Sequence, residues 1–461
     1  MENCLTVNKI LEICNGELIS GDRGLEVVSF MQDSREVKSG DIYVGIKGEN
    51  TDGNDFYEMA FAKGAIGCML QKLPDGEALE KYSDKVVIKV TDTIKALQEL
   101  AKYQRSLYDI PVIGITGSVG KTSTKDMVSS VMAQEFNVCK TEGNYNNHIG
   151  LPLTLLKLKE HTAAVVEMGM NHLGEISILT DIAKPTVCVF TNIGTAHIGL
   201  LGSRENILKA KLEMLEGMKA GGEVIINNDN DLLHDWAAKN SGYNIHTYGI
   251  DNNSDYMAYN ISQTSEGSIF NIDVDGKEYN IEVPVAGMHF VYNSLCAIAV
   301  GRLFNIEMES IMKGITELKL TAKRMAIEKI KDNITVINDS YNASYDSMKA
   351  ALEVLKDTRA SKRIAVLGEM RELGDFSKEL HEKVGEEVAK NSIDILITVG
   401  KDAEYIGKKA EELGLDEIYF CEDKAKAVEI LKRKLCTNDA ILLKASMLMH
   451  FSEILDELKE W

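Results

Sequence analysis

The stretch from residue 114 to residue 127, G-I-T-G-S-V-G-K-T-S-T-K-D-M, combines residue types that bind nucleotide phosphates. An apolar run, P-V-I-G-I-T, precedes the loop and reads as a strand, and a helical pattern begins at Lys121. Gly117 and Gly120 let backbone N–H groups approach phosphate oxygens between the strand and the helix. Lys121 can reach the β- and γ-phosphates, and the Thr122 hydroxyl can bind Mg²⁺. The predicted nucleotide-binding loop comprises Gly117, Ser118, Val119, Gly120, Lys121, Thr122 and Ser123.

The glycine spacing of this loop differs from the usual P-loop pattern, G-x-x-x-x-G-K-[ST]. That pattern would place its first glycine at position 115, where this chain has Ile115, and the glycines stand at 114 and 117 instead. A GTPase switch would also need a guanine-reading N-K-x-D stretch, and the chain has none. The loop therefore predicts nucleotide binding, whereas the reaction has to be inferred from residues farther along the chain.

Polar residues follow the next two predicted strands. The run A-A-V-V-E-M-G contains Glu167, and T-V-C-V-F-T-N-I-G-T-A-H leads to His197. Because ligands bind at the carboxyl ends of strands in open α/β sheets, this carboxylate and imidazole could reach a metal ion in front of the loop. Residues 141–150, T-E-G-N-Y-N-N-H-I-G, add amides that include Asn144 and Asn147. That segment reads equally as a ligand-binding loop and as a plain polar turn.

Composition narrows the class of protein. A chain of 461 residues should hold about three domains. The formal net charge of -20 disfavours general binding to nucleic acid or to anionic membranes. No apolar run is long enough to span a bilayer, and the first residues do not resemble a secretory signal. The eight cysteines form no C-x-x-C pair, which indicates reduced thiols and a cytoplasmic protein.

The pattern of apolar runs divides the chain into three blocks. Residues 1–107 combine short strands with helices, and the last helix, T-D-T-I-K-A-L-Q-E-L, has Thr91 or Asp92 as a cap and bridges into the next block. Residues 108–320 alternate strands and helices as βαβ units do, with an antiparallel patch near 255–285 and a hairpin at Asp275-Gly276. Residues 321–461 alternate again. The predicted fold is α/β, with a small α/β N-terminal domain, a central P-loop ATPase domain on a parallel sheet, and a C-terminal Rossmann-like domain.

Taken together, these motifs resemble the Mur ligases, the ATP-dependent amide ligases that build the peptide of peptidoglycan. The likeness runs along nearly the whole chain, through D-S-R-E-V-K-S-G-D near residue 33, E-M-G-M-N-H-L-G-E-I from residue 167, N-D-S-Y-N-A from residue 338 and L-G-E-M-R-E-L-G from residue 367. The displaced glycine fits too, because T-G-x-x-G-K-T is this family's own P-loop. Within the family, the chain is most similar to the members that add D-alanyl-D-alanine.

The resemblance implies a reaction with two organic substrates and ATP. The terminal carboxylate of UDP-MurNAc-tripeptide attacks the γ-phosphate and forms an acyl phosphate, which the amine of D-Ala-D-Ala then attacks. The products are UDP-MurNAc-pentapeptide, ADP and phosphate, so the enzyme serves peptidoglycan precursor synthesis. The resemblance also implies two Mg²⁺ ions and a monomeric protein. It leaves open whether the third residue of the peptide is lysine or diaminopimelate.

Roles for the central residues follow from the same resemblance. Lys121, with Mg²⁺ on Thr122 and Glu167, would neutralise the charge of the two anions that meet in the first step. His197 would bind the second Mg²⁺. The lysine that matches Lys211 is carbamylated by CO₂ in the family and helps to hold that second ion, and Lys209 is the alternative by spacing.

Further roles are implied for residues nearer the two ends of the chain. Asn293 would meet adenine, and Arg324 and Asp339 would reach the ATP phosphates and ribose, with Tyr341 and Asn342 in the same element. Ser34 and Arg35 would contact the uridine diphosphate, since an arginine suits a diphosphate. The chain departs from the family's motifs at Asn54, Phe290, Ala445 and Met447, where the family has histidine, asparagine, glycine and arginine.

Three rival interpretations remain. Folylpolyglutamate synthase shares the P-loop, the carbamylated lysine and the acyl-phosphate route, but it lacks the D-S-R-x-x-x-x-G-D element that residues 33–41 carry. A muramyl ligase that adds a different amino acid is the second rival. The third is a regulatory nucleotide-binding module without turnover, which the retained Lys121, Glu167, His197 and Lys211 disfavour.

Overall fold

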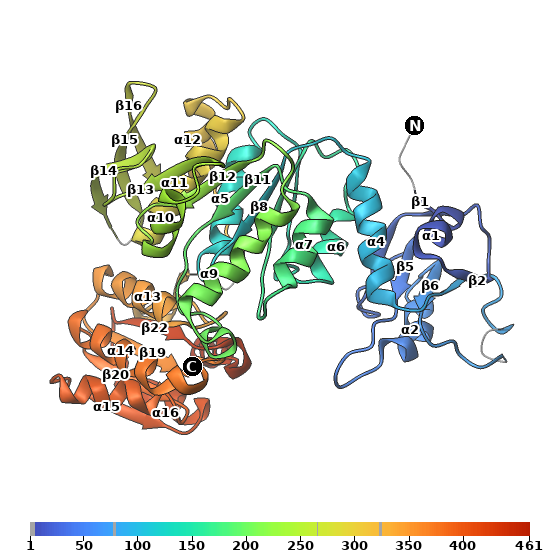
Figure 1. The fold of residues 1–461 in the computed structure, drawn as a ribbon. Coiled ribbons are helices and arrows are strands. Elements are labelled where there is room, and N and C mark those ends of the chain that lie inside the picture. The colour runs from blue at the N-terminus through green and yellow to red at the C-terminus, as the bar shows by residue number, and fades with distance from the viewer. Residues whose placement is uncertain (1–4, 77–79, 265, 322–324) are drawn as a thin grey trace.

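The computed structural model describes residues 5–76, 80–264, 266–321 and 325–461 of the chain. Figure 1 shows three lobes in chain order, with the N-terminal lobe set apart from the other two and joined to them through helix α4, Thr93–Ser106. The predicted α/β class is confirmed, because each lobe is built on a sheet with parallel strands.

The N-terminal lobe contains a five-stranded sheet with the order β2-β7-β6-β5-β4. The four strands from β4 to β7 run parallel, and β2 pairs antiparallel with β7. A separate two-stranded sheet pairs β1 with β3. The elements are β1 Leu5–Thr6, α1 Val7–Cys14, β2 Glu17–Ser20, β3 Glu26–Val27, β4 Ser29–Met31, β5 Asp41–Val44, α2 Tyr57–Ala62, β6 Gly67–Leu70 and β7 Val86–Lys89.

Helix α4 connects this lobe to the central one, as the sequence predicts. Asp92 caps it by accepting N–H groups of Ile94 and Lys95 at 2.9 and 3.0 Å. At its other end Arg105 is 3% exposed and donates to the carbonyls of Ala183 and Lys184 at 2.8 and 3.4 Å. Those carbonyls end helix α7, Glu175–Ala183, and they would otherwise lack intrahelical partners. Arg105 therefore fastens the connecting helix to the central lobe.

The central lobe contains a nine-stranded sheet with the order β16-β15-β14-β13-β12-β11-β8-β10-β9. Strands β8 to β13 are parallel, and every residue of the central strands β8, β10 and β11 is buried, as expected for a parallel sheet that helices cover on both faces. The strands are β8 Val112–Thr116, β9 Val138–Lys140, β10 Ala163–Glu167, β11 Val187–Phe190, β12 Glu223–Asn227, β13 Asn244–Gly249, β14 Tyr256–Gln263, β15 Ser268–Val274 and β16 Lys277–Val283. The other helices are α5 Lys121–Met132, α6 Gly150–Leu155, α8 Ile198–Leu201, α9 Arg204–Leu212, α10 Asp231–Ala238, α11 Met288–Leu303 and α12 Met308–Thr316.

The antiparallel patch predicted near 255–285 is confirmed in strands β14, β15 and β16. Asp275 and Gly276 join the last two strands, and both have positive φ, at 52° and 77°. Two positive φ values in succession define the type I′ turn that fits the twist of a hairpin.

The C-terminal lobe contains a six-stranded sheet with the order β17-β18-β22-β19-β20-β21. All pairs are parallel except that of β17 with β18. Alternate residues of these strands enter two separate cores, so that Ile337 and Leu442 lie on one face and Val336 and Leu443 on the other. The elements are β17 Ala326–Lys329, β18 Thr335–Asn338, α13 Tyr345–Asp357, β19 Arg363–Gly368, α14 Ser377–Lys390, β20 Ile395–Val399, α15 Glu404–Glu412, β21 Ile418–Cys421, α16 Lys424–Lys434, β22 Ala440–Lys444 and α17 Ser452–Glu460.

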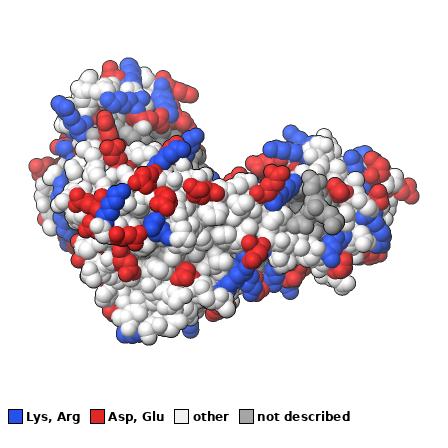
Figure 2. Space-filling model, turned by 90° about the horizontal axis from the view of Figure 1, so that it is seen from above, with Lys and Arg blue, Asp and Glu red and all other residues white. Residues whose placement is uncertain are grey.

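The surface agrees with the composition. The face shown in Figure 2 carries acidic and basic side chains interspersed, without a broad basic patch. Within the described ranges, no helix has both the length and the apolar character that crossing a bilayer requires.

Arg105→Met should lower the stability of the central lobe, because it leaves the buried carbonyl of Ala183 at the end of α7 without this donor. An unsatisfied buried acceptor costs roughly 1–3 kcal/mol, so a loss of about this size is expected. Thermal unfolding followed by circular dichroism should show a midpoint roughly 5–10 °C lower. Lys102→Met on the same helix is the control, since Lys102 makes only surface ion pairs with Glu99 and Asp181. An equal shift in the two variants would contradict this role of Arg105.

Candidate active site

The P-loop has a backbone that requires its two inner glycines. Gly120 has φ of 80° and precedes the first turn of α5. A Cβ atom at Gly117 would lie 1.9 Å from the Thr191 hydroxyl, so no side chain fits there. The glycine of the usual pattern is missing at 115 because Ile115 is a fully buried residue of strand β8. The loop is therefore complete with glycines at 117 and 120.

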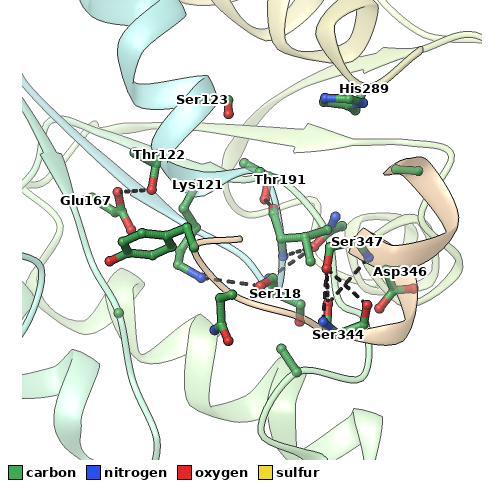
Figure 3. A pocket seen from close by; sticks show the side chains of 18 of the residues that line it. Ser118, Lys121, Thr122, Ser123, Glu167, Thr191, His289, Ser344, Asp346 and Ser347 are labelled. Atoms are coloured by element: carbon green, nitrogen blue, oxygen red, sulfur yellow. Dashed lines mark hydrogen bonds between the residues drawn. The ribbon is translucent and has the colours of Figure 1, made fainter. Parts of the chain in front are cut away.

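The P-loop lysine lies against the loop itself. Lys121 Nζ donates to the carbonyl of Gly117 at 2.7 Å and to that of Ser118 at 3.4 Å, as Figure 3 shows for Ser118. The N–H groups of Ser118 and Val119 donate to Asn192 Oδ1 at 3.0 Å each. Asn192 follows strand β11, so a neighbouring strand end orders the loop through its amide.

Thr122 and Glu167 form a compact set of oxygen atoms at the start of α5. Thr122 Oγ1 donates to Glu167 Oε2 at 2.9 Å (Figure 3), and Asn146 Nδ2 donates to Glu167 Oε1 at 2.7 Å. Glu167 is 1% exposed, at the carboxyl end of strand β10. A hydroxyl and a buried carboxylate are hard oxygen ligands, so these residues fit Mg²⁺.

A cavity of about 670 Å³ opens in front of the loop and is enclosed by the central and C-terminal lobes. Most of the predicted site residues line it. They are Ser118, Val119, Gly120, Lys121, Thr122, Ser123, Asn144, Asn147, Glu167, His197, Asn293, Asp339, Tyr341 and Asn342. Gly117 does not line the cavity and is packed against Thr191. Arg324, which was also predicted, falls outside the described residues.

Helix α11 provides one wall of the cavity. Asn293 accepts a hydrogen bond from Thr124 Oγ1 at 2.9 Å, and its buried Nδ2 has no partner among the described residues. Burial lowers the pKa of His289 to about 4, so this ring is neutral at pH 7. Phe290 is fully buried and does not line the cavity. The phenylalanine that stands where an asparagine was expected therefore packs in the hydrophobic core. The Asn293 amide nitrogen is left without a partner among the described residues, in a residue that lines the cavity.

The C-terminal lobe provides the opposite wall. Buried Lys444 pairs with Asp339 and also donates to the carbonyl of Asn342 at 3.2 Å. Ala445 is fully buried beside Gly368, whereas Met447 is about half exposed at the cavity. Position 447, where the resemblance led us to expect an arginine, therefore presents a thioether to the cavity.

The loop of residues 194–199 touches the C-terminal lobe directly. Asp346, at the start of α13, accepts the N–H of Thr195 at 3.1 Å. His197 Nδ1 lies 2.5 Å from Glu372 Oε2, and this hydrogen bond is the main cause that lowers the pKa of the Glu372 carboxyl. The carboxyl ends of two sheets thus meet around the cavity.

The two candidate lysines of helix α9 differ in burial. Lys209 is exposed, whereas Lys211 is 2% exposed and has neither a hydrogen bond nor an ion pair among the described residues. Desolvation, and then the nearby Lys121, lower the pKa of Lys211 well below its ordinary value. Lys211 does not line the cavity.

The N-terminal residues lie apart from this cavity. Ser34 is buried, and the exposed Arg35 is held by Asp33, with Nε to Oδ1 at 2.9 Å. Neither residue lines the cavity. Asn54 is buried and accepts the N–H of Gln71 at 2.8 Å, so it orders a turn of its own lobe.

Several lining residues escaped the sequence analysis. Asn146 and Asn192 stand within quoted motifs, yet nothing in the sequence distinguishes their amides from the neighbouring ones. Asp229 follows strand β12 and accepts the Tyr292 hydroxyl at 2.9 Å, and its position at a strand end was an available signal. The other missed lining residues include Tyr248, His289, Ser344, Asp346, Ser347 and Lys444.

Known proteins resemble the chain over its whole length. Residues 28–105 match the description "Mur ligase family, catalytic domain", residues 115–301 match "Mur ligase middle domain", and residues 323–447 match "Mur ligase, glutamate ligase domain". The UDP-N-acetylmuramoyl-tripeptide–D-alanyl-D-alanine ligase of Bacillus subtilis is 38% identical, over 99% of this chain and 98% of that protein.

Solved structures agree. The crystal structure of MurF from Acinetobacter baumannii has a TM-score of 0.89 at 28% identity and covers 100% of both chains. The MurF ligase of Thermotoga maritima in complex with ADP has a TM-score of 0.80 at 26% identity, over 94% of this chain and 97% of that one. With three family descriptions matched in order and a relative 38% identical over nearly all residues, the chain belongs to the Mur ligase family.

Proposed function

We propose that this chain is the ATP-dependent ligase that joins D-alanyl-D-alanine to UDP-MurNAc-tripeptide and releases ADP and phosphate. The observation that carries the proposal is the relative at 38% identity, which is named for this reaction and aligns over 99% of the chain. The cavity supports it chemically, because a phosphate-binding loop faces carboxylates and amides from two lobes.

The first chemical demand is that a carboxylate attacks a phosphate although both are anions. The P-loop amides and Lys121 would hold the γ-phosphate, and their effect would be stronger once bound substrates exclude water from the cavity. Mg²⁺, held by Thr122 and Glu167, would supply further positive charge to the phosphates when bound. Asn146 would hold the carboxylate of Glu167 in the orientation that the structure shows.

The second demand is a set of binding sites for the adenine and ribose of ATP and for the uridine diphosphate of the peptide substrate. Asn293 would use its unpaired Nδ2 to bind adenine, and Asp339 would bind ribose with Lys444 as its fixed partner. Ser34 and Arg35 would bind the uridine diphosphate in the N-terminal lobe. A cytoplasmic enzyme would suit nucleotide-linked and ATP substrates, and the seven described cysteines are all free.

The carbamate of Lys211 is also part of this proposal, together with a second Mg²⁺ near His197. Carbamylation needs a neutral amine, and burial next to Lys121 lowers the pKa of Lys211 in the required direction. As a carbamate, the side chain would present anionic oxygen in place of a buried amine near Lys121. Lys209 lacks this environment because it is exposed.

The proposed activity is tested by supplying ATP, Mg²⁺, UDP-MurNAc-tripeptide and D-Ala-D-Ala and by detecting UDP-MurNAc-pentapeptide with mass spectrometry. Phosphate release should require both organic substrates, because water would otherwise consume the acyl phosphate. Rapid ATP hydrolysis without D-Ala-D-Ala, and no pentapeptide, would defeat the assignment. Parallel reactions with lysine- and diaminopimelate-containing tripeptides identify the third residue.

Lys121→Ala should lower kcat by about 100-fold or more, because it removes a positive charge from the phosphoryl-transfer site. The measurement is pentapeptide formation at saturating substrates. Lys140→Ala is the matched control, since Lys140 is a partly exposed lysine of the neighbouring strand β9. Near-normal kcat in Lys121→Ala would mean that this loop does not hold the reacting phosphate.

Lys211→Ala should be nearly inactive, and excess acetate or formate should restore part of the activity by placing a carboxylate in the same space. With ¹³C-bicarbonate, the wild type should show a carbamate signal in its ¹³C NMR spectrum, and Lys211→Ala should lose it. Lys209→Ala should keep both the signal and the activity. A carbamate that persists in Lys211→Ala, or rescue of Lys209→Ala instead, would exclude Lys211 as the modified residue.

A further inference from the structure

Among the described residues, the His197 ring is hydrogen-bonded to Glu372 of the other lobe. Glu372 follows strand β19 in the C-terminal lobe, and its Oε2 lies 2.5 Å from His197 Nδ1. The backbone carbonyl of Glu372 accepts the N–H of Gly199 at 3.0 Å. One residue therefore fastens two points of the loop that carries His197.

The backbone on both sides is shaped for this contact. His197 and Glu372 have φ of 64° and 62°, in the left-handed region that non-glycine residues seldom adopt. Such conformations cost on the order of 1–3 kcal/mol and persist where the surroundings determine them. A Cβ atom at Gly199 would come within 2.4 Å of the carbonyl carbon of Leu373, so the two segments meet too closely for a side chain.

The hydrogen bond selects which ring nitrogen of His197 faces a ligand. A carboxylate only accepts, so Nδ1 carries the proton in this contact, and the neutral tautomer that it selects is the one with its lone pair on Nε2. His197 lines the same cavity as Thr122 and Glu167. Carboxylates that accept from the far nitrogen of a histidine fix both the tautomer and the orientation of metal-binding rings.

We propose that Glu372 is a positioning residue, which sets the tautomer and direction of the His197 ring when the C-terminal lobe lies against the central lobe. The inference rests on the proposed function for its link to catalysis. Through Glu372, the C-terminal lobe would then influence cation binding although it contributes no ligand itself. A central lobe that has parted from its neighbour then has a misdirected histidine.

The test uses the full-length chain labelled with ¹⁵N in its histidine rings, first without metal or nucleotide. The His197 signals are identified by their absence from His197→Asn. The wild type should show the tautomer protonated at Nδ1, and Glu372→Ala should shift the ring toward protonation at Nε2. Glu372→Gln should partly restore the wild-type pattern, because its amide oxygen can still accept from Nδ1.

The second readout is the Mg²⁺ concentration that gives half-maximal pentapeptide formation, which should rise about tenfold or more in Glu372→Ala. Glu379→Ala is the matched control, because Glu379 is an exposed glutamate of the same lobe that pairs with Lys383 at 2.7 Å. Gly199→Ala should shift the His197 ring in the same direction as Glu372→Ala, since it forces the two segments apart. It provides the same readouts if Glu372→Ala does not fold.

Unchanged ¹⁵N ring shifts together with an unchanged Mg²⁺ dependence in the folded variants would overturn the proposal. This outcome is separate from a failure of the proposed function. If the wild type forms no pentapeptide, the function is wrong, while the ring spectra still decide whether Glu372 positions His197.

Discussion

The need to bring two anions together governs the organisation of this molecule. A carboxylate and a triphosphate repel each other, and the chain itself has a net charge of -20. Positive character therefore has to be concentrated in one place. The P-loop amides, the start of α5 and Lys121 would supply it at the end of strand β8, which lies between β11 and β10 in the parallel part of the sheet. Burying the Glu167 carboxylate costs free energy unless its oxygens have partners. Thr122 and Asn146 donate one hydrogen bond to each of the two oxygens.

The second level of organisation is the meeting of two sheets by their carboxyl ends. The ends of strands β8, β10, β11 and β12 line the cavity on the P-loop side, and the ends of β18 and β22 line the facing side. The pair of buried Lys444 with partly buried Asp339 keeps charged groups in fixed positions at this junction. No described residue of the N-terminal lobe lines the cavity, and helix α4 connects that lobe to the central one.

Local features were predictable from the sequence, and contacts between distant segments were not. The P-loop, the Asp92 cap and the hairpin at Asp275 follow from short-range rules of backbone geometry. Glu167 and His197 were predicted because strand ends share one edge of a parallel sheet. The pairing of His197 with Glu372 joins residues 175 apart, and no periodicity relates them. The choice between Lys209 and Lys211 depends on which helix face is covered, and the structure covers that of Lys211. The family resemblance favoured Lys211, whereas spacing alone left Lys209 as an alternative.

The close approach of Gly117 to Thr191 constrains which residues can occupy these two positions, which are far apart in the sequence. A side chain at 117 would collide with the hydroxyl at 191, whereas Thr191 Oγ1 itself donates to the carbonyl of Val119 at 2.8 Å. A mutation at either position therefore alters the same loop, although 74 residues separate them. Among homologues, these two sites should change jointly or stay unchanged. The shape of the P-loop therefore depends on the end of strand β11 beside it. Transferring the loop sequence alone into another sheet would not reproduce that shape.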